Sequence, residues 1–323
     1  MTTISRRTCL AGLALATPLG ARAQSAHPGG QTVRMVVPFA PGGSTDIVAR
    51  ILADKLAAMW GSPVVVENFG GAGGNIGNDR VAKAPTDGLT LLMASPALAT
   101  NQYLYRRLAY DPERDLVPVS LVVLVPNVII ARKTLPVRSV GELIAYAKAE
   151  HDRLTYAHSG VGTSGHLSAE LFKRVTGTGM RAVAYRGGAP AVADVLSGNV
   201  DLNFANISSV IEQIRSGTVK CLGISTPKPS SLAPELIPIA DSVPGFESSA
   251  YFGIAMRAGT VPAILTKVEA DVRTALTDPT GRKRLQDTVN EPVGSSAAEF
   301  AGLLARERER FGKLIADLGI KLD

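Results

Sequence analysis

Two strand-turn-helix segments in separate halves of the chain constrain its fold most. The first, residues 36–46, passes from an apolar strand through a Pro-Gly-Gly turn into a helix that opens at Ser44 or Thr45. The second, residues 156–166, repeats this order. Backbone N–H groups at a helix start, with the positive end of the helix dipole, bind anions such as carboxylates without a basic side chain. Two such turns predict a cleft that holds a small anion from both sides.

The first 23 residues have the pattern of a secretory leader. Arg6 and Arg7 form a charged start, Leu10–Leu19 is a short apolar stretch, and Ala21-Arg22-Ala23 fits a small-residue cleavage site. We predict cleavage after Ala23 and export to the periplasm. The arginine pair is compatible with twin-arginine export as well as with the general secretory route, and both stay open.

The mature chain has a composition that fits two globular domains. Removing the leader leaves 300 of the 323 residues, and because the leader carries three arginines and no acid, the formal charge falls from +6 to +3. No basic run interleaved with aromatic residues remains, which argues against a nucleic-acid partner. Cys221 is then the only cysteine, so an intrachain disulfide is excluded, and we interpret it as core packing.

Strand-like and helix-like segments alternate along the mature chain, which predicts an α/β fold. The expected strands are 33–39, 64–66, 89–94, 121–131, 154–158, 180–185, 200–204, 219–225 and 251–256. The expected helices are 45–60, 75–84, 139–150, 164–175, 190–197, 261–276 and 297–318. A Pro- and Ser-rich segment, 226–245, is expected to be a long loop.

Pro126 lies in the middle of the apolar segment 121–131. A proline removes a ladder hydrogen bond, so we expect a bend or a crossing there. The chain would then build one lobe from 24–125 plus 228–323 and a second lobe from 126–227, with approximate boundaries. Two crossovers make a hinge, and the predicted architecture is therefore a two-lobed α/β protein with an interlobe ligand cleft.

The second turn also supports a rival hypothesis, a dinucleotide-binding site. Residues 160–165 match the pattern G-x-G-x-x-G after a strand and before a helix. About 20 residues on, where such sites place a ribose-binding acid, the chain has Arg186, which could accept the 2′-phosphate of NADP. An exported NADP-dependent oxidoreductase is therefore the alternative. The plainer interpretation of each turn is a tight, capped helix start, and His166 either donates to a carboxylate or only caps and packs.

We expect no catalytic residue, no metal site and no cofactor. Neither Ser44 nor Ser164 lies in a G-x-S-x-G nucleophile elbow. No cluster of cysteine, histidine and carboxylate residues has the spacing of metal ligands. The sequence therefore indicates a binding protein rather than an enzyme.

Several long motifs follow one another along the mature chain. They are Pro38–Asp46, Val65–Asn68, Gly71–Gly77, Ala84–Gly88, Gly162–Leu167, Tyr185–Ala191 and Phe252-Gly253. In this order they resemble the Bug family, the TctC-like periplasmic solute-binding proteins of tripartite tricarboxylate transporters. The resemblance covers essentially the whole mature chain. It implies a two-lobed periplasmic binding protein fold, type II-like, without enzymatic activity.

The resemblance also assigns ligand-binding positions. They are Gly43, Ser44, Thr45 and Asp46 in the first turn, Thr163, Ser164 and His166 in the second, and Phe39 and Ser159 along the pocket. The implied ligand is a small organic carboxylate, held by backbone groups and ordered waters. The implied partners are the membrane permease subunits of the transporter, and we expect a monomer. A ligand sensor for a membrane signalling protein is a further alternative, because the same fold and site would serve it.

The chain departs from the family pattern at a few positions. Where the family commonly has Phe-Asp-Asn, this chain has Phe204-Ala205-Asn206, so an acid that would pair with a ligand amine is missing. We therefore include Ala205 in the site and expect a mono- or dicarboxylate without an amino group. Phe69-Gly70 stands for a common Arg-Pro near the cleft, and Tyr251 stands for a common Trp in the hinge strand.

Overall fold

The computed structural model describes residues 27–150 and 153–321. The predicted leader and its cleavage site after Ala23 lie outside the described residues. None of the helices in this part of the chain combines the length and the apolarity that crossing a bilayer requires.

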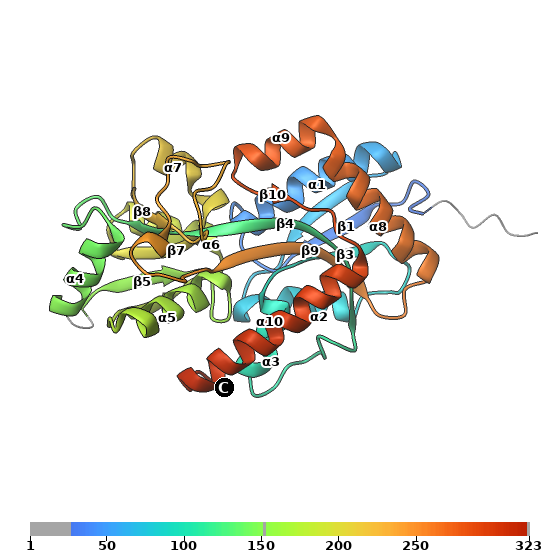
Figure 1. Ribbon diagram of the computed structural model, residues 1–323. Helices are drawn as coiled ribbons and strands as arrows, with labels where there is room; N and C mark the ends of the chain where they lie inside the picture. The colour runs from blue at the N-terminus through green and yellow to red at the C-terminus, as the bar shows by residue number, and fades with distance from the viewer. Residues whose placement is uncertain (1–26, 151–152, 322–323) are drawn as a thin grey trace, which may run out of the picture.

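The described residues form a mixed α/β fold around a curled sheet (Figure 1). The strands are β1 (Val33–Val37), β2 (Val64–Asn68), β3 (Thr90–Ala94), β4 (Leu116–Ala131), β5 (Thr155–His158), β6 (Arg181–Ala184), β7 (Leu202–Asn206), β8 (Lys220–Ile224), β9 (Ser249–Arg257) and β10 (Glu291–Pro292). The helices are α1 (Ser44–Trp60), α2 (Asn75–Ala82), α3 (Ala97–Leu104), α4 (Val140–Glu150), α5 (Ser164–Thr176), α6 (Gly188–Leu196), α7 (Ile211–Arg215), α8 (Pro262–Thr277), α9 (Pro279–Asp287) and α10 (Ala297–Leu318). Short 3-10 turns occupy Ala72–Gly74, Ile207–Ser209 and Ile239–Asp241.

One long strand joins the two lobes. The strand order is β2-β1-β3-β9-β4-β7-β5-β6, with β8 and β10 also paired to β4. The first part of β4 pairs antiparallel with β9, and its last residues pair antiparallel with β7 and β8. Figure 1 shows β4 and β9 running from one half of the molecule to the other. In one half β1 runs parallel to β2 and β3, and in the other half β5 runs parallel to β6 and β7.

Pro126 lies inside β4 and does not interrupt it. The strand is continuous over 16 residues. The pairing partner nevertheless changes there: Pro126 is in register with Ser249 of β9, and the next residue, Asn127, is in register with Asn206 of β7. A residue without an N–H is tolerated at this point because one ladder ends and another begins.

Local chemistry accounts for the elements that carry the site. β1 has a nearly continuous apolar sequence, VRMVV, and is buried along most of its length, as expected for a strand covered on both faces. α1 and α5 each end at a glycine in the left-handed region, Gly61 at φ 57° and Gly177 at φ 63°. The predicted helices α1 and α5 are thereby confirmed, with ends within two residues.

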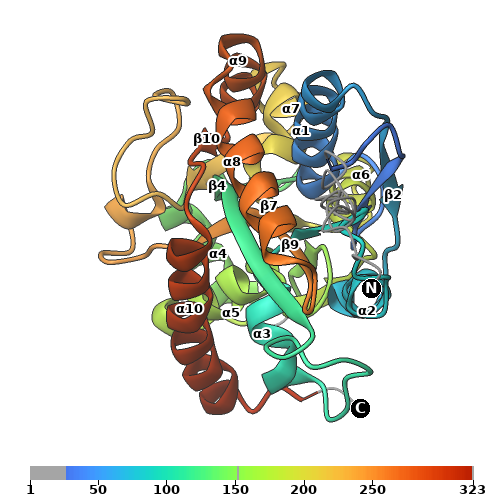
Figure 2. The same cartoon turned by 90° about the vertical axis from the view of Figure 1, so that its right-hand side faces the viewer.

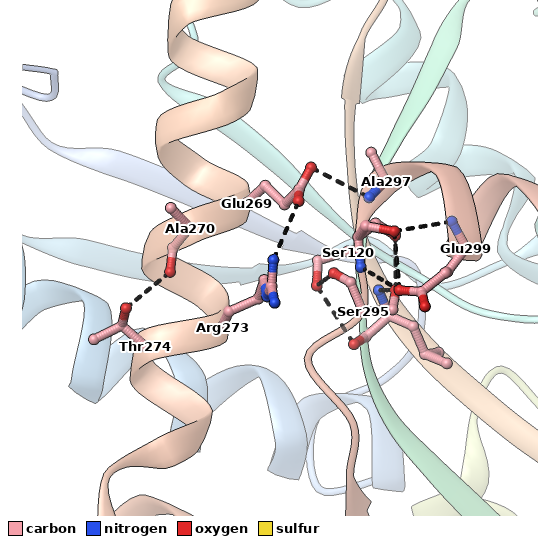
Figure 3. Close-up of polar contacts among 10 residues, drawn as sticks. Ser120, Glu269, Ala270, Arg273, Thr274, Ser295, Ala297 and Glu299 are labelled. Atoms are coloured by element: carbon pink, nitrogen blue, oxygen red, sulfur yellow. Dashed lines mark hydrogen bonds and ion pairs between the residues drawn. The ribbon is translucent and has the colours of Figure 1, made fainter.

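Helix α10 runs along one side of the molecule in Figure 2, and several hydrogen bonds fix its first residues. Ser296 and Glu299 form a capping box, and the N–H of Ala297 donates to Glu269 of α8 (Figure 3). Ser120 of β4 donates to the carbonyl of Ser295 at 2.7 Å. These contacts fix the start of α10 against both α8 and the long strand.

Some elements were not predicted. Helices α3, α7 and α9 have weak or short apolar periodicity, and α6 begins at Gly188, two residues before the proline that we expected to open it. α9 is polar and is stabilised by its N-cap, where Asp278 accepts from the N–H of Gly281 at 2.8 Å. The segment 226–245 is largely loop, as predicted.

Candidate functional site

The starts of four helices converge on one small cavity. It is lined from α1 by Gly43, Ser44 and Thr45, from α3 by Ser95 and Pro96, from α5 by Thr163 and Ser164, from α6 by Gly188, and from strands and turns by Phe39, Ser159, Asn206 and Phe252. Its volume is about 20 Å³. That volume holds about one water molecule, so any larger ligand must enter with the lobes further apart.

The first turn is held by a buried carboxylate. Asp46, 3% exposed, accepts from the N–H of Gly42 at 2.9 Å, from Asn68 at 2.9 Å and from the guanidinium of Arg50 at 2.9 and 3.0 Å. Burial raises the pKa of Asp46, but these hydrogen bonds outweigh burial and the pKa is lowered overall. Asp46 therefore stays ionised and shapes the turn, while the N-cap residue, Gly43, makes no side-chain capping bond.

The second turn closes on its own carbonyl. The side chain of Thr163 donates to the carbonyl of Gly160 at 2.6 Å, and the N–H of Thr163 donates to the same oxygen at 3.3 Å. Thr163 makes no side-chain cap hydrogen bond to α5. Thr163 and the first residue of α5, Ser164, both line the cavity.

A polar network joins the two turns through the strand that links the lobes. Asn206 donates to Asn127 at 2.7 Å and to the hydroxyl of Ser164 at 2.9 Å. The hydroxyl of Ser44 donates to the carbonyl of Asn206 at 3.3 Å. Asn127 is 1% exposed and also donates to the carbonyl of Ser248 at 3.0 Å. Asn206 therefore links the two turns, because its backbone carbonyl accepts from Ser44 and its side-chain amide donates to Ser164.

Seven of the ten predicted site residues line the cavity and three do not. The seven are Phe39, Gly43, Ser44, Thr45, Ser159, Thr163 and Ser164. Asp46 is engaged with Arg50, and Ala205 packs into the main core cluster. His166 is buried behind the second turn, where its Nδ1 accepts from the N–H of Gly162 at 3.4 Å.

Sequence reasoning did not assign Ser95 or Pro96 to the cavity, nor Asn127, which lies behind the cavity and accepts from Asn206. Asn127 carried a usable signal, because it is the polar residue after Pro126 in an otherwise apolar strand. Ser95 and Pro96 precede α3, which was not predicted, so nothing in the local pattern pointed to them. Asn206 takes the place at the cavity that we had considered for its neighbour Ala205, since successive strand side chains point to opposite faces.

A larger cavity adjoins the small one. It has a volume of about 380 Å³ and shares Phe39 and Ser159 with the small cavity. Its other walls are Gly71–Gly74 and Tyr105 from one lobe and residues 160–161 and 184–186 from the other. The two cavities together form a cleft with a narrow part at the helix starts and a wider part beside it.

The G-x-G-x-x-G match at 160–165 is explained by packing. A Cβ on Gly160 would lie 3.3 Å from the Cα of Gly73, and one on Gly162 would lie 2.5 Å from Leu104. A Cβ on Gly165 would lie 2.1 Å from the carbonyl of Phe204. The opposite lobe thus occupies the space in front of the first two glycines, where a dinucleotide site needs its pyrophosphate.

The chain is similar to known solute-binding receptors. Residues 48–320 match the family described as "Tripartite tricarboxylate transporter family receptor". Protein BugT of Bordetella pertussis is 35% identical over 316 residues, which cover 97% of this chain and 96% of that protein. A structure of Rpa4515 from R. palustris with adipate has a TM-score of 0.87 and 36% identity, covering 90% of this chain and 99% of that one. MatC (Rpa3494) from Rhodopseudomonas palustris with bound malate has a TM-score of 0.83 and 32% identity, covering 88% and 99%.

Proposed function

This chain belongs to the family of tripartite tricarboxylate transporter receptors, and we propose that it captures a small organic carboxylate between its two lobes and delivers it to a membrane permease. Members of this family are periplasmic solute-binding proteins. Export with removal of a leader after Ala23, action as a monomer and the absence of catalysis and of a cofactor are parts of the same proposal. A ligand sensor that signals to a membrane protein stays as the second candidate, since its fold and site would be the same.

The convergence of the starts of α1 and α5 on one cavity supports this proposal most directly. Neither helix is capped by the side chain of its N-cap residue, and the described residues that line the cavity are mainly hydroxyl residues and glycines, with two phenylalanines and no basic side chain. One helix start contributes roughly 0.3–1 kcal/mol toward an anion, and up to about 2 kcal/mol when partly buried. Several helix starts with directed N–H bonds, closed off from water, would be needed for useful affinity.

The bound ligand class follows from the walls of the cleft. Similar proteins have been solved with adipate and with malate, and the cavity here offers no carboxylate that would pair with a ligand amine. We therefore propose a mono- or dicarboxylate without an amino group. Its first carboxylate would lie in the small cavity, and the rest of the molecule would extend toward the larger one.

The lobe boundaries belong to the same proposal. We place lobe 1 at 24–125 plus 228–323 and lobe 2 at 126–227. The change of partner of β4 at Pro126 supports the first boundary.

A thermal-shift screen of the mature protein tests the proposal. The ligands are mono-, di- and tricarboxylates, acidic amino acids and NADPH. A ligand that binds only the folded state adds about 2.7 kcal/mol of stability at a hundredfold excess over Kd. We expect a concentration-dependent rise in Tm with one class of carboxylate. A rise with NADPH alone would instead support the oxidoreductase alternative.

Proline at the first helical position tests the backbone contact itself. Ser44 is the first residue of α1, and Gly43 before it is extended at φ −82°, ψ 168°, a conformation that precedes proline readily. Ser44→Pro removes the N–H and the hydroxyl, whereas Ser44→Ala removes only the hydroxyl. We expect Ser44→Pro to weaken carboxylate binding by roughly tenfold more than Ser44→Ala, the effect of one hydrogen bond to a charged group. Equal Kd values for the two variants would exclude this N–H as a ligand donor.

A further inference from the structure

Two buried imidazoles lie behind the second turn. His158 ends β5 and His166 lies in the first turn of α5, and they are 1% and 5% exposed. Their ring centroids are 4.6 Å apart. Neither side chain lines the small cavity. The turn between them, residues 159–163, supplies Ser159 and Thr163 to that cavity.

Each imidazole accepts a hydrogen bond from the turn. The N–H of Gly160 donates to Nδ1 of His158 at 3.2 Å, and the N–H of Gly162 donates to Nδ1 of His166 at 3.4 Å. A backbone N–H is always a donor, so both Nδ1 atoms must be unprotonated. Each ring is therefore neutral and carries its proton on Nε2, since a charged imidazolium has no acceptor.

The surroundings favour this neutral state. Burial lowers the pKa of His158 to about 4, and burial together with His158 and Lys173 lowers the pKa of His166 to about 3. The charged groups that face the rings are Glu170 and Lys173, and they are paired with each other at 2.8 Å. Tyr156 donates to Glu170 at 2.5 Å and closes that side of the cluster.

The turn is held from its other side by the opposite lobe. The hydroxyl of Thr100 in α3 donates to the carbonyl of Gly162 at 2.9 Å. Gly160 and Gly162 have φ values of 137° and 83°, so the turn has a conformation that few other residues adopt. Thr163 and Thr100 thus engage the carbonyls of Gly160 and Gly162, and the N–H groups of the same two glycines bond to the imidazoles.

We propose that His158 and His166 are positioning residues for ligand binding: as neutral acceptors they hold the N–H groups of Gly160 and Gly162, and so keep the start of α5 aimed at the carboxylate. This inference rests on the proposed function. It assigns the two histidines a role through the turn, with no contact to the ligand. It also makes binding sensitive to acid, because a protonated imidazole would present a donor to each N–H.

The tautomers can be read directly by nitrogen-15 NMR of the histidine side chains. The chain has four histidines, which single substitutions assign. We expect His158 and His166 to carry the proton on Nε2 and to stay neutral from neutral pH down to about pH 5. A proton on Nδ1 of either ring, or titration at an ordinary imidazole pKa of about 6.5, would overturn the proposal. This readout needs no ligand.

Binding variants separate the acceptor from the bulk of the ring. Asparagine places an oxygen acceptor near the position of Nδ1 and does not titrate, whereas leucine has no acceptor. We expect His158→Leu to weaken carboxylate binding by about tenfold or more, because a buried N–H is left unpaired, and His158→Asn to stay within about threefold of wild type. His27→Asn, at a half-buried histidine bonded to the carbonyl of Gly88 away from the cleft, is the matched control. Equal losses for the leucine and asparagine variants would sink the idea.

Kd values of the wild type and of His158→Asn, measured over a range of pH, give a further test. If His158 only fills space, the two proteins should respond to pH in the same way. Protonation of the ligand is common to both proteins, so the ratio of their Kd values isolates the imidazole. We expect the Kd of the wild type divided by the Kd of His158→Asn to be constant near pH 7. This ratio should rise as pH falls toward 4, because His158 gains its proton there and the wild type then binds more weakly. A ratio that does not change with pH contradicts the proposal. If the wild type binds no carboxylate at all, the proposed function fails, and the NMR result still decides the role of the histidines in the turn.

Discussion

Asp46 shows how a single charged residue next to a binding site can serve the site without touching it. Its two oxygens accept four hydrogen bonds from Gly42, Arg50 and Asn68, and these bonds stiffen the first turn. The i,i+4 pair with Arg50 differs from surface pairs of the same spacing, since the Asp46 side chain is only 4% exposed. Changing one partner of such a buried, hydrogen-bonded pair costs more stability than changing one partner of an exposed pair, because the groups left behind are buried without their partner.

We expect Asp46→Asn to lower the free energy of unfolding by roughly 2 kcal/mol at pH 7, because hydrogen bonds to a charged acceptor are lost. The folded-state pKa of Asp46 is lowered, so its contribution is present above the unfolded pKa of about 3.9 and is lost as pH falls further. The difference between variant and wild type should therefore shrink below about pH 4. Urea unfolding of both proteins at pH 7 and below about pH 4 measures this difference in the free energy of unfolding.

The matched control is Asp287→Asn, which breaks an exposed i,i+4 pair with Lys283. We expect it to change stability by less than about 0.5 kcal/mol. A similar loss in both variants would show that burial does not distinguish the two pairs.

Glycine-rich turns form the seam where the two lobes meet. The N–H of Ala40 donates to the carbonyl of Arg186 at 3.0 Å, a direct backbone bond across the cleft. A Cβ on Gly70 would lie 2.9 Å from that same carbonyl, and one on Gly73 would lie 2.5 Å from the carbonyl of Val161. Backbone can approach backbone here because Gly70 and Gly73 have no Cβ. The seam brings the helix starts close enough to enclose a cavity of about 20 Å³.

We expect Gly73→Ala to weaken carboxylate binding by roughly tenfold or more, because the added methyl group keeps the lobes apart and reduces the population of the closed form. Gly73 and Gly177 have nearly the same φ, 60° and 63°, but a Cβ on Gly177 meets nothing within 4 Å. Gly177→Ala therefore carries the same backbone strain of about 1 kcal/mol and should leave Kd unchanged. Calorimetry measures Kd for both variants. Equal Kd values would show that the close backbone contact at Gly73 does not affect carboxylate binding.

The whole molecule is tied together by α10 as well as by β4 and β9. A small apolar cluster joins Phe311 and Ile315 of α10 to Leu104 of α3 and Leu167 of α5. Arg174 of α5 and Asp317 of α10 form an ion pair at 3.1 Å beside it. The end of α10 therefore packs on both sides of the cleft, which Figure 1 shows as the helix approaching α3 and α5. Motion between the lobes must repack this cluster.

We expect Phe311→Ala to lower the free energy of unfolding by roughly 3–4 kcal/mol, the usual cost of removing a buried aromatic ring. Phe311 is 4% exposed, whereas Val175 at the end of α5 is 52% exposed. Val175→Ala should cost less than about 0.5 kcal/mol. Denaturant unfolding compares them, and a loss below about 1 kcal/mol for Phe311→Ala would mean that the end of α10 is not packed across the cleft.

The α/β class, the two turns and most helices and strands followed from the sequence alone. Their signals are local: apolar runs with strand or helix periodicity, and glycines at turns and helix ends. Helices α3 and α9 are not predicted from the sequence, because α3 is short and α9 is polar. Tertiary packing and the Asp278 cap stabilise these two helices instead of a strong local pattern. The family resemblance also followed from ordered local motifs, and family membership is confirmed.

Only the tertiary structure determines which residues line the cavity. Sequence placed Ser44 and Ser164 at helix starts, but only folding brings Ser95, from α3, and Asn206, from β7, to the same point. The sequence did not distinguish Asp46, which holds the turn, from residues that face the cleft. The physical reason is that a turn motif determines where backbone N–H groups point, whereas the facing of side chains depends on elements distant in the chain. The local sequence therefore determines the two turns and their helix starts, and the whole fold determines which residues line the cavity between them.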